Sequence, residues 1–182
     1  VYKELAANLE TELRGQELTV ANSLSLLIRL SQVTANLYPV GGEESCRHIA
    51  EENPKIKELL SMFEEHETFP SLVVSRFTQE VKDACLALRE AYPDRTIEYI
   101  IGDVKDSERE DIKSRFKRGE VDTIVATPGT IAVGLNMQTA TTVHFLSNDY
   151  SYVTREQAEG RIWRMGQKSE RCTFIDYIAN ST

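Results

Sequence analysis

From Pro70 onward, short apolar runs rich in β-branched residues alternate with amphipathic stretches of helical length, and this alternation limits the fold more than any other feature of the sequence. The runs expected to be strands are Leu72–Ser75, Thr96–Ile101, Val121–Thr127, Thr142–Leu146 and Cys172–Ile178. The stretches expected to be helices are Gln79–Ala91, Ser107–Lys117 and Val153–Arg164. Strands that alternate with helices of about 10 to 15 residues require crossover connections and form a mostly parallel sheet covered on both faces. The sequence therefore predicts a doubly wound α/β domain over residues 68–182.

Residues 1–67 follow a different pattern, because their apolar residues recur near the 3.6-residue period of a helix. The residues concerned are Leu5, Leu9, Leu13, Leu24, Leu27, Ile28 and Leu37. Asn53 and Pro54 predict a further helix start, since proline is tolerated in the first turn. We therefore expect residues 1–67 to form a helical extension without strands.

Composition is that of an ordinary globular chain, with 41% apolar and 27% charged residues among 182. No apolar run approaches the roughly 20 residues that cross a bilayer, and the N-terminus lacks the layout of a signal peptide, so we expect an intracellular protein with no membrane partner. Cys46, Cys85 and Cys172 stand far apart, which argues against a disulfide framework and a zinc site. The histidines also lack the spacing of metal ligands, so no metal site is predicted, and His144 is expected in the core.

A net charge of −8 argues at first against nucleic acid, whose phosphates are bound mainly by lysine and arginine. The acidic excess lies in residues 1–100, with 10 basic against 17 acidic residues, whereas residues 101–182 carry 11 against 12. The second half clusters its cations, as in IKSRFKRG, so a local basic face is compatible with the sequence.

The stretch QAEGRIWRMGQ, residues 157–167, places two cations and an amide at helical spacing. On a helix Gln157, Arg161 and Arg164 would share one face with Gly160, and two arginines three residues apart can close on a triphosphate with donors matched to phosphoryl oxygens. The alternative is a surface helix with solvated arginines near its C-terminal end, and this motif taken alone favours it.

A second motif, PGTIAVGLNMQTATTV, follows the expected strand that ends at Thr127. Gly134 would let the backbone approach a phosphate or a sugar, and Asn136 could form a hydrogen bond there; the alternative is a tight turn that begins a helix. Ligands of doubly wound folds gather at the carboxyl ends of the strands. The loops to inspect are those after Ser75, Ile101, Thr127 and Leu146.

Together these motifs resemble motifs five and six of the Swi/Snf-type (sucrose-non-fermenting) helicase-like ATPases, a group of the superfamily-two helicases; the stretches are IVATPGTIAVGLNMQTATTVHFL and SNDYSYVTREQAEGRIWRMGQKSERCTFIDYI. Upstream, SLVVSRFTQEVKDACLALRE is similar to motif four of that family and IIGDVKDSEREDIKSRFKRGE to the segment after it. LLIRLSQVTANLYP resembles the helical segment before the second lobe. The resemblance covers nearly the whole chain and implies the C-terminal RecA-like lobe of a two-lobed motor, with the N-terminal RecA-like lobe missing.

The resemblance also implies roles for single residues. Arg161 and Arg164 would be catalytic arginine fingers that reach ATP, which with Mg²⁺ is held mainly by the absent lobe of the same polypeptide. The residues implied on the nucleotide side are Gln157, Gly134 and Asn136. The residues implied to contact nucleic acid are Thr127, Gly129, Ser75, Arg76 and Arg109. For Ser75, Arg76 and Arg109, the alternative is a chance Ser-Arg pair and an ordinary helix start.

Some positions depart from the family pattern. Ile131-Ala132 replaces the paired glycines of motif five, Trp163 replaces a histidine between the two arginines, and SNDYSY replaces a Trp-Asn-Pro run. These variants look more like bacterial or phage members than nuclear remodellers, which favours a cytoplasmic location over a nuclear one.

The expected function is that of a lobe of a DNA-dependent ATPase that moves along duplex DNA. One alternative is a lobe of a strand-separating helicase, and another is a stand-alone nucleic-acid or protein-binding module without ATPase activity. The sequence contains no G-x-x-x-x-G-K-[ST] phosphate loop, so the isolated chain is expected to be inactive. A G-x-G-K-T stretch encoded upstream would favour the motor.

Overall fold

A five-stranded sheet lies at the centre of residues 56–177 in the computed structural model, and all of its strand pairs are parallel. Its strands are β5 (Ser71–Val74), β6 (Ile97–Ile100), β7 (Thr123–Ala126), β8 (Thr142–Phe145) and β9 (Thr173–Asp176). They lie in the order β6-β7-β5-β8-β9. The structure describes residues 2–3, 6, 10–13, 16–19, 23–39, 46–132, 137–148 and 151–180. Each predicted strand after Pro70 is confirmed, as is the doubly wound α/β class.

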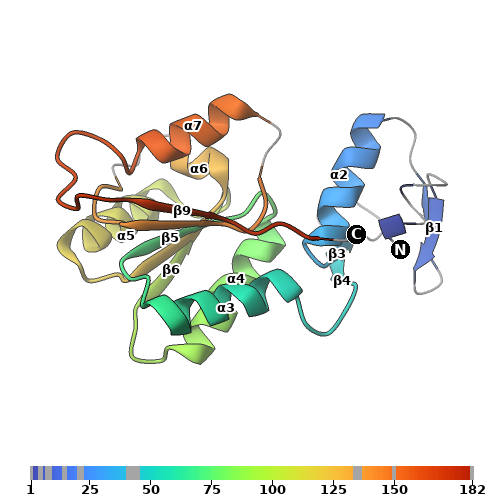
Figure 1. Ribbon diagram of the computed structural model, residues 1–182, viewed down its shortest axis with the longest axis horizontal. Coiled ribbons are helices and arrows are strands. Elements are labelled where there is room, and N and C mark those ends of the chain that lie inside the picture. Colours follow the sequence, from blue (N-terminus) through green and yellow to red (C-terminus); the bar gives the residue numbers. More distant parts are fainter. Residues whose placement is uncertain are drawn as a thin grey trace. The chain divides into compact units, whose positions relative to one another are not determined.

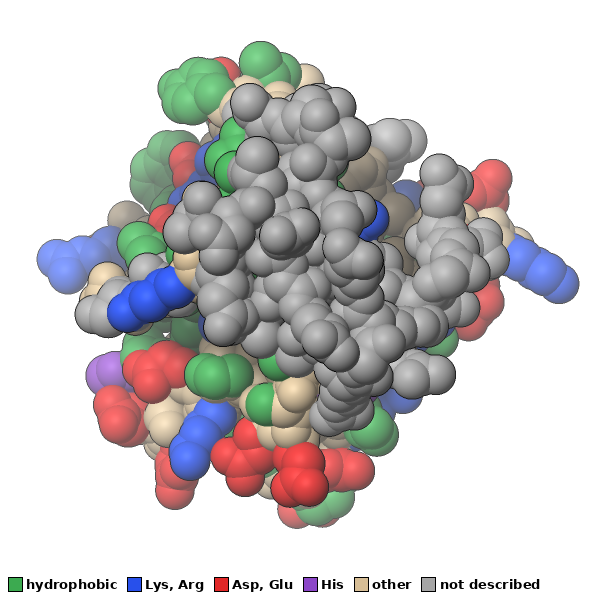
Figure 2. Space-filling model, turned by 90° about the vertical axis from the view of Figure 1, so that its right-hand side faces the viewer, with side chains coloured by type: hydrophobic (Ala, Val, Ile, Leu, Met, Phe, Trp, Pro, Cys, Tyr) green, Lys and Arg blue, Asp and Glu red, His purple; other side chains and the backbone are tan. Residues whose placement is uncertain are grey.

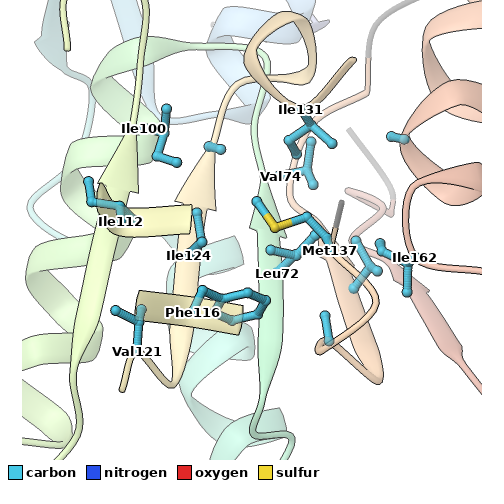
Figure 3. Packing of buried hydrophobic residues seen from close by; sticks show 14 of the residues in the cluster. Leu72, Val74, Ile100, Ile112, Phe116, Val121, Ile124, Ile131, Met137 and Ile162 are labelled. Atoms are coloured by element: carbon cyan, nitrogen blue, oxygen red, sulfur yellow. The ribbon is translucent and has the colours of Figure 1, made fainter. Parts of the chain in front are cut away.

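One face of the sheet is covered by the helices that follow β6, β7 and β8. These are α5 (Asp106–Arg118), α6 (Pro128–Ala132) and α7 (Tyr152–Gly160). Phe116 of α5, Ile131 of α6 and Ala158 of α7 are buried against Leu72 and Val143 of the strands. Figure 3 shows this packing, in which side chains from neighbouring strands point into one apolar layer.

The opposite face is covered by α3 (Pro54–His66) and α4 (Thr78–Ala91), which lie below the sheet in Figure 1. Leu59 and Phe63 of α3 and Leu88 of α4 pack with Val73 and Val125, which point to this face because side chains alternate along a strand. Helices therefore shield both faces of the sheet from solvent. This explains why the residues of the central strands β5 and β7 are all apolar or small.

The helix predicted from Val153 to Arg164 ends earlier than expected, at Gly160. Tighter turns replace it, since Ile162 N–H donates to the carbonyl of Glu159, three residues back. Gly166 then adopts a φ of 99°, a left-handed value that suits glycine. The prediction of one continuous helix through Arg164 is therefore wrong.

Residues Val1–Lys55 and Ile178–Thr182 form the second compact unit. Its described elements are β1 (Glu10–Leu13), β2 (Gln16–Thr19), α2 (Ser23–Thr34), β3 (Leu37–Pro39) and β4 (Cys46–His48). β1 pairs with β2, and β3 pairs with β4, both antiparallel. Asn36 joins α2 to β3 at a φ of 61°, and its side-chain amide exchanges hydrogen bonds with the backbone of Ala50 at 2.8 and 3.0 Å.

The expectation for residues 1–67 is thus met only in part. Helices α2 and α3 agree with a helical extension, but strands β1 to β4 do not. The sequences of β1, β2 and β4 are ETEL, QELT and CRH, which lack the apolar, β-branched runs by which the strands of the sheet were predicted.

Acidic side chains are concentrated in and around α3. The exposed residues there are Glu51, Glu52, Glu58, Glu64, Glu65 and Glu67. Figure 2 shows a group of acidic side chains on the lower part of the face it presents. Such a surface repels polyanions. No helix in the described ranges is long and apolar enough to span a membrane.

Candidate functional site

The carboxyl ends of the central strands β5 and β8 are joined by a buried polar cluster. Ser147 donates a hydrogen bond of 2.7 Å to Glu80 on α4, Ser75 donates to the same carboxylate oxygen, and the two hydroxyls lie 3.0 Å apart. All three side chains are buried. The hydroxyl of Ser75 is therefore used within the fold, and its predicted contact with nucleic acid stays a prediction.

Arg76 follows directly and lies at the surface of this edge, where it is half-buried. Its backbone N–H donates to Ser147 at 2.9 Å, and its guanidinium carbon lies 5.9 Å from the ring centre of Phe77. The buried cluster therefore positions the backbone of Arg76, which is one of the predicted nucleic-acid contacts.

Arg109 is positioned by the loop after β6. Its guanidinium donates to the backbone carbonyls of Ile101, at 3.1 Å, and Gly102, and it pairs with Asp106 at 3.4 Å. The arginine of the predicted motif thus holds the loop that precedes α5, and a contact with nucleic acid would be additional to this role.

The loop after β7 begins with Thr127, whose hydroxyl lies 3.2 Å from that of Thr130. Thr130 also donates to the carbonyls of Thr127, at 2.7 Å, and Ile100, at 3.1 Å, which fixes the start of α6. Gly129 is exposed, and a side chain placed there would meet nothing within 4 Å. Thr127 and Gly129 are thus accessible at the carboxyl edge, the edge of the sheet at which the strands end. Gly134 and Asn136 lie outside the described residues.

Helix α7 starts at the same edge and is anchored by Arg155. Its guanidinium donates two hydrogen bonds to the carboxylate of Asp176 at 2.5 and 3.1 Å, one to Asn148 at 3.0 Å and one to Glu159 at 2.5 Å. It also lies over the ring of Phe145, 3.5 Å from its centre. Burial alone would raise the pKa of Asp176, but hydrogen bonds from Arg155 and Asn148 outweigh it and lower that pKa.

The predicted catalytic pair lies beyond the other end of α7, in the segment Arg161–Gln167, which we call the arginine turn. Gln157 and Arg164 are exposed and Arg161 is half-buried. Figure 1 shows the chain leaving α7 at the end of the sheet from which β9 starts, the amino edge. Arg76, Thr127 and Gly129 thus lie at the carboxyl edge, where ligands were expected, whereas the two arginines lie at the amino edge; the contacts predicted for all of them stay predictions.

The arginine turn is held by residues 137–140, which lead into β8. Met137 N–H donates to the carbonyl of Arg161 at 3.2 Å, and the Gln138 side chain donates to the carbonyl of Met165. Gln167 donates to the carbonyl of Ala140 at 3.0 Å. The sequence analysis assigned no role to Gln138 or Gln167. Gln167 could have been found, because it is the last residue of the arginine motif.

Other features lie apart from these residues. A cavity of about 280 Å³ opens at the amino edge, between the segments that precede β5, β6, β7 and β8. Its described lining includes Phe69, Arg95 and Asp122 and none of the candidate residues. Within the described ranges, no group of three His, Cys, Asp or Glu side chains could hold a metal ion.

Comparison with known proteins gives a family match and a set of similar structures. Residues 54–166 match the model of the helicase conserved C-terminal domain. Comparison with curated proteins gave no match. The crystal structure of the C-terminal part of the Fun30 ATPase domain is similar, with a TM-score of 0.64 and 18% identity over 72% of this chain and 42% of that one.

Two DEAD-box structures are also similar. The C-terminal domain of the DEAD-box protein Dbp5 has a TM-score of 0.59 and 16% identity over 71% of this chain and 72% of that one. Domain 2 of the Mss116p DEAD-box helicase, bound to an RNA duplex, has a TM-score of 0.54 and 18% identity over 66% and 48%. This chain thus spans less than half of the Fun30 and Mss116p chains. The likeness shows a common RecA-like fold.

Proposed function

Because the chain belongs to the helicase conserved C-terminal domain family, we propose that it is the C-terminal RecA-like lobe of a Swi/Snf-type motor that couples ATP hydrolysis to movement along duplex DNA. The N-terminal RecA-like lobe of the same polypeptide would hold ATP and its Mg²⁺. This division of labour is supported by the sequence, which contains no phosphate-binding loop of the G-x-x-x-x-G-K-[ST] type.

The observation that carries the proposal is the exposed Arg164 on a turn that hydrogen bonds hold in place. An arginine finger must leave its own fold to reach a nucleotide bound elsewhere, and it must keep one position to stabilise charge on the transferring phosphoryl group. Arg161, which is half-buried one turn earlier, would be the second finger, and the exposed Gln157 would help to orient the nucleotide.

Nucleic acid would bind at the carboxyl edge, away from the arginine turn. Thr127 and Gly129 are accessible there, and the backbone of Arg76 is fixed by the buried serine cluster. Backbone N–H groups and hydroxyls at such an edge suit phosphate oxygens. The similar Mss116p domain 2 was solved with an RNA duplex, which supports nucleic acid as the ligand class. Gly134 and Asn136 would connect this edge to the nucleotide.

Arg164→Ala tests this function in the full-length protein. It should lower nucleic-acid-stimulated ATP turnover by about 10³-fold or more, because an arginine finger contributes that much in other NTPases. Binding of a fluorescent ATP analogue should change far less, since the other lobe holds the nucleotide. Arg171→Ala is the matched control, because Arg171 is exposed and lies outside the arginine turn. Undiminished turnover in the Arg164 variant would contradict the finger role.

The same assay separates the alternatives. Stimulation by duplex DNA without strand separation supports the translocase, whereas release of a labelled strand supports the strand-separating helicase. Stronger stimulation of ATP turnover by duplex RNA than by duplex DNA would identify RNA as the substrate. Full-length protein that binds nucleic acid but hydrolyses no ATP would leave the stand-alone binding module as the better description.

A further inference from the structure

Gln167, at the end of the arginine turn, forms hydrogen bonds through both ends of its amide. Its amide nitrogen donates to the carbonyls of Ala140, at 3.0 Å, and Ile162, at 3.3 Å, and lies 3.4 Å from the sulfur of Cys172. Its amide oxygen accepts from the backbone N–H of Ser169 at 3.1 Å. One half-buried side chain therefore joins the turn to the segment before β8 and to the segment before β9.

Gln138 contacts the same turn at a second point. Its amide donates to the carbonyl of Met165, next to Arg164, while Met137 N–H holds the carbonyl of Arg161. We call the two glutamines, with these backbone partners, the glutamine clasp. It joins segments that lie 27 residues apart in the sequence.

The turn needs such support because it has left the regular helix. After Gly160 the N–H of Arg164 bonds only two residues back, to the carbonyl of Ile162, instead of four. The exposed neighbours of Arg164 offer little packing, since Met165 is 96% and Trp163 59% exposed. Ile162 anchors the turn in the core, and the backbone carbonyls held from outside add a second constraint on where the turn stands.

We propose that Gln167 is a positioning residue for Arg161 and Arg164, assisted by Gln138. It fixes the backbone of the arginine turn through its carbonyls, so that the guanidinium groups stand ready before the nucleotide arrives. This inference rests on the proposed arginine-finger function. It adds that the position of the fingers is set by residues 137–140 as well as by α7.

The first test measures order in the turn without any ATPase activity. Trp163 is the single tryptophan of the chain and lies between the two arginines, so its fluorescence anisotropy decay reports motion of the turn. Gln167→Leu keeps the size but removes the donor, and should speed the local decay of Trp163 in the 182-residue chain. Gln79→Leu is the matched control, because Gln79 is a half-buried glutamine whose amide donates to Asp83 on α4.

The second test measures turnover in the full-length protein. Gln167→Leu should lower kcat about tenfold to a hundredfold, because a misplaced catalytic group costs this much, and should change the KM for ATP less than about threefold. Gln138→Ala should act in the same direction with a smaller loss, since it removes one hydrogen bond from a partly exposed side chain.

The outcomes separate this inference from the proposed function. An unchanged Trp163 decay in Gln167→Leu overturns the clasp, and so does normal turnover in both glutamine variants when Arg164→Ala is inactive. Normal ATP turnover in Arg164→Ala would contradict the proposed arginine-finger function itself. Should Gln167→Leu fail to fold, Gln138→Ala decides: slower turnover with a faster Trp163 decay supports the clasp, and wild-type values reject it.

Discussion

His144 can take up a proton, but its surroundings in the fold favour the neutral form. It lies in β8, fully buried, with one ring nitrogen 2.8 Å from the hydroxyl of Tyr177 and the other 3.1 Å from that of Thr68. Its ring stacks on Phe63 with 4.8 Å between centres. Burial lowers the pKa of His144 from 6.5 to about 4. The expectation that this histidine belongs to the core is confirmed.

We predict that stability falls between pH 6.5 and about pH 4 because of His144. In this window the unfolded chain takes up a proton that the folded chain excludes, so the free energy of unfolding decreases as pH falls, by on the order of 3 kcal/mol in total. Urea unfolding at several pH values should show this slope, and His144→Gln should flatten it while lowering stability at pH 7. An identical slope in His144→Gln would contradict the assignment.

The candidate site residues show how far the role of a single residue can be predicted from the sequence. Arg161 and Arg164 stand out because their motif is specific, and the exposed Arg164 fits the predicted role. Ser75 and Arg109 belong to less specific motifs, and their side chains are engaged with Glu80 and with backbone carbonyls. Local sequence cannot distinguish these cases, because the partner lies in another element.

At the scale of elements, α7 depends on an ion pair at its first turn. Arg155 and Asp176 form a bidentate, partly buried pair that joins the helix to the end of β9. We predict that Arg155→Asp lowers the free energy of unfolding by about 2 kcal/mol, as expected for hydrogen bonds between charged groups. The double variant Arg155→Asp, Asp176→Arg should recover part of the loss, which thermal or urea unfolding would measure.

The control for that experiment is an ion pair of the same type in a different setting. Arg118 and Glu120 pair at 2.5 Å but are exposed, so Arg118→Asp should leave the unfolding transition unchanged within error. If the swapped pair at positions 155 and 176 is no more stable than Arg155→Asp alone, the pair does not anchor α7.

Elements were predictable where they were long or buried on both faces. The strands of the sheet are apolar runs between turn residues. Helix α5, expected over Ser107–Lys117, ends at Arg118, where the N–H of Gly119 donates to the carbonyls of Arg115 and Phe116 at a φ of 78°. The strands β1, β2 and β4 were missed because they lack an apolar, β-branched run. The early end of α7 was missed because the contact of Arg161 with Met137 joins segments that are distant in the sequence.

For the whole molecule we predict negligible ATP turnover by the isolated 182-residue chain, with or without duplex DNA. The sequence contains no phosphate-binding loop, and the described residues include no carboxylate cluster for Mg²⁺. Phosphate release should stay at background, while circular dichroism confirms that the chain is folded. Turnover comparable to that of the full-length protein would contradict the two-lobe assignment.

The fold class followed from the alternation of strands and helices, but the strand order β6-β7-β5-β8-β9 did not, because pairing between distant strands is a tertiary property. The separation of the candidate residues follows from the parallel connection between β8 and β9, because α7 runs from the carboxyl edge back to the amino edge. Residues that the sequence places in consecutive motifs end at opposite edges of one sheet, with the candidate nucleic-acid contacts at one edge and the arginine turn at the other.

Gly166 closes the arginine turn under two constraints at once. Its φ of 99° disfavours any side chain, and a methyl group there would come within 3.2 Å of the Gln138 amide. A smaller residue at 138 would relieve the contact but not the backbone strain. Glycine should therefore be retained at 166 in any evolved or engineered lobe that keeps this turn, whatever residue stands at 138.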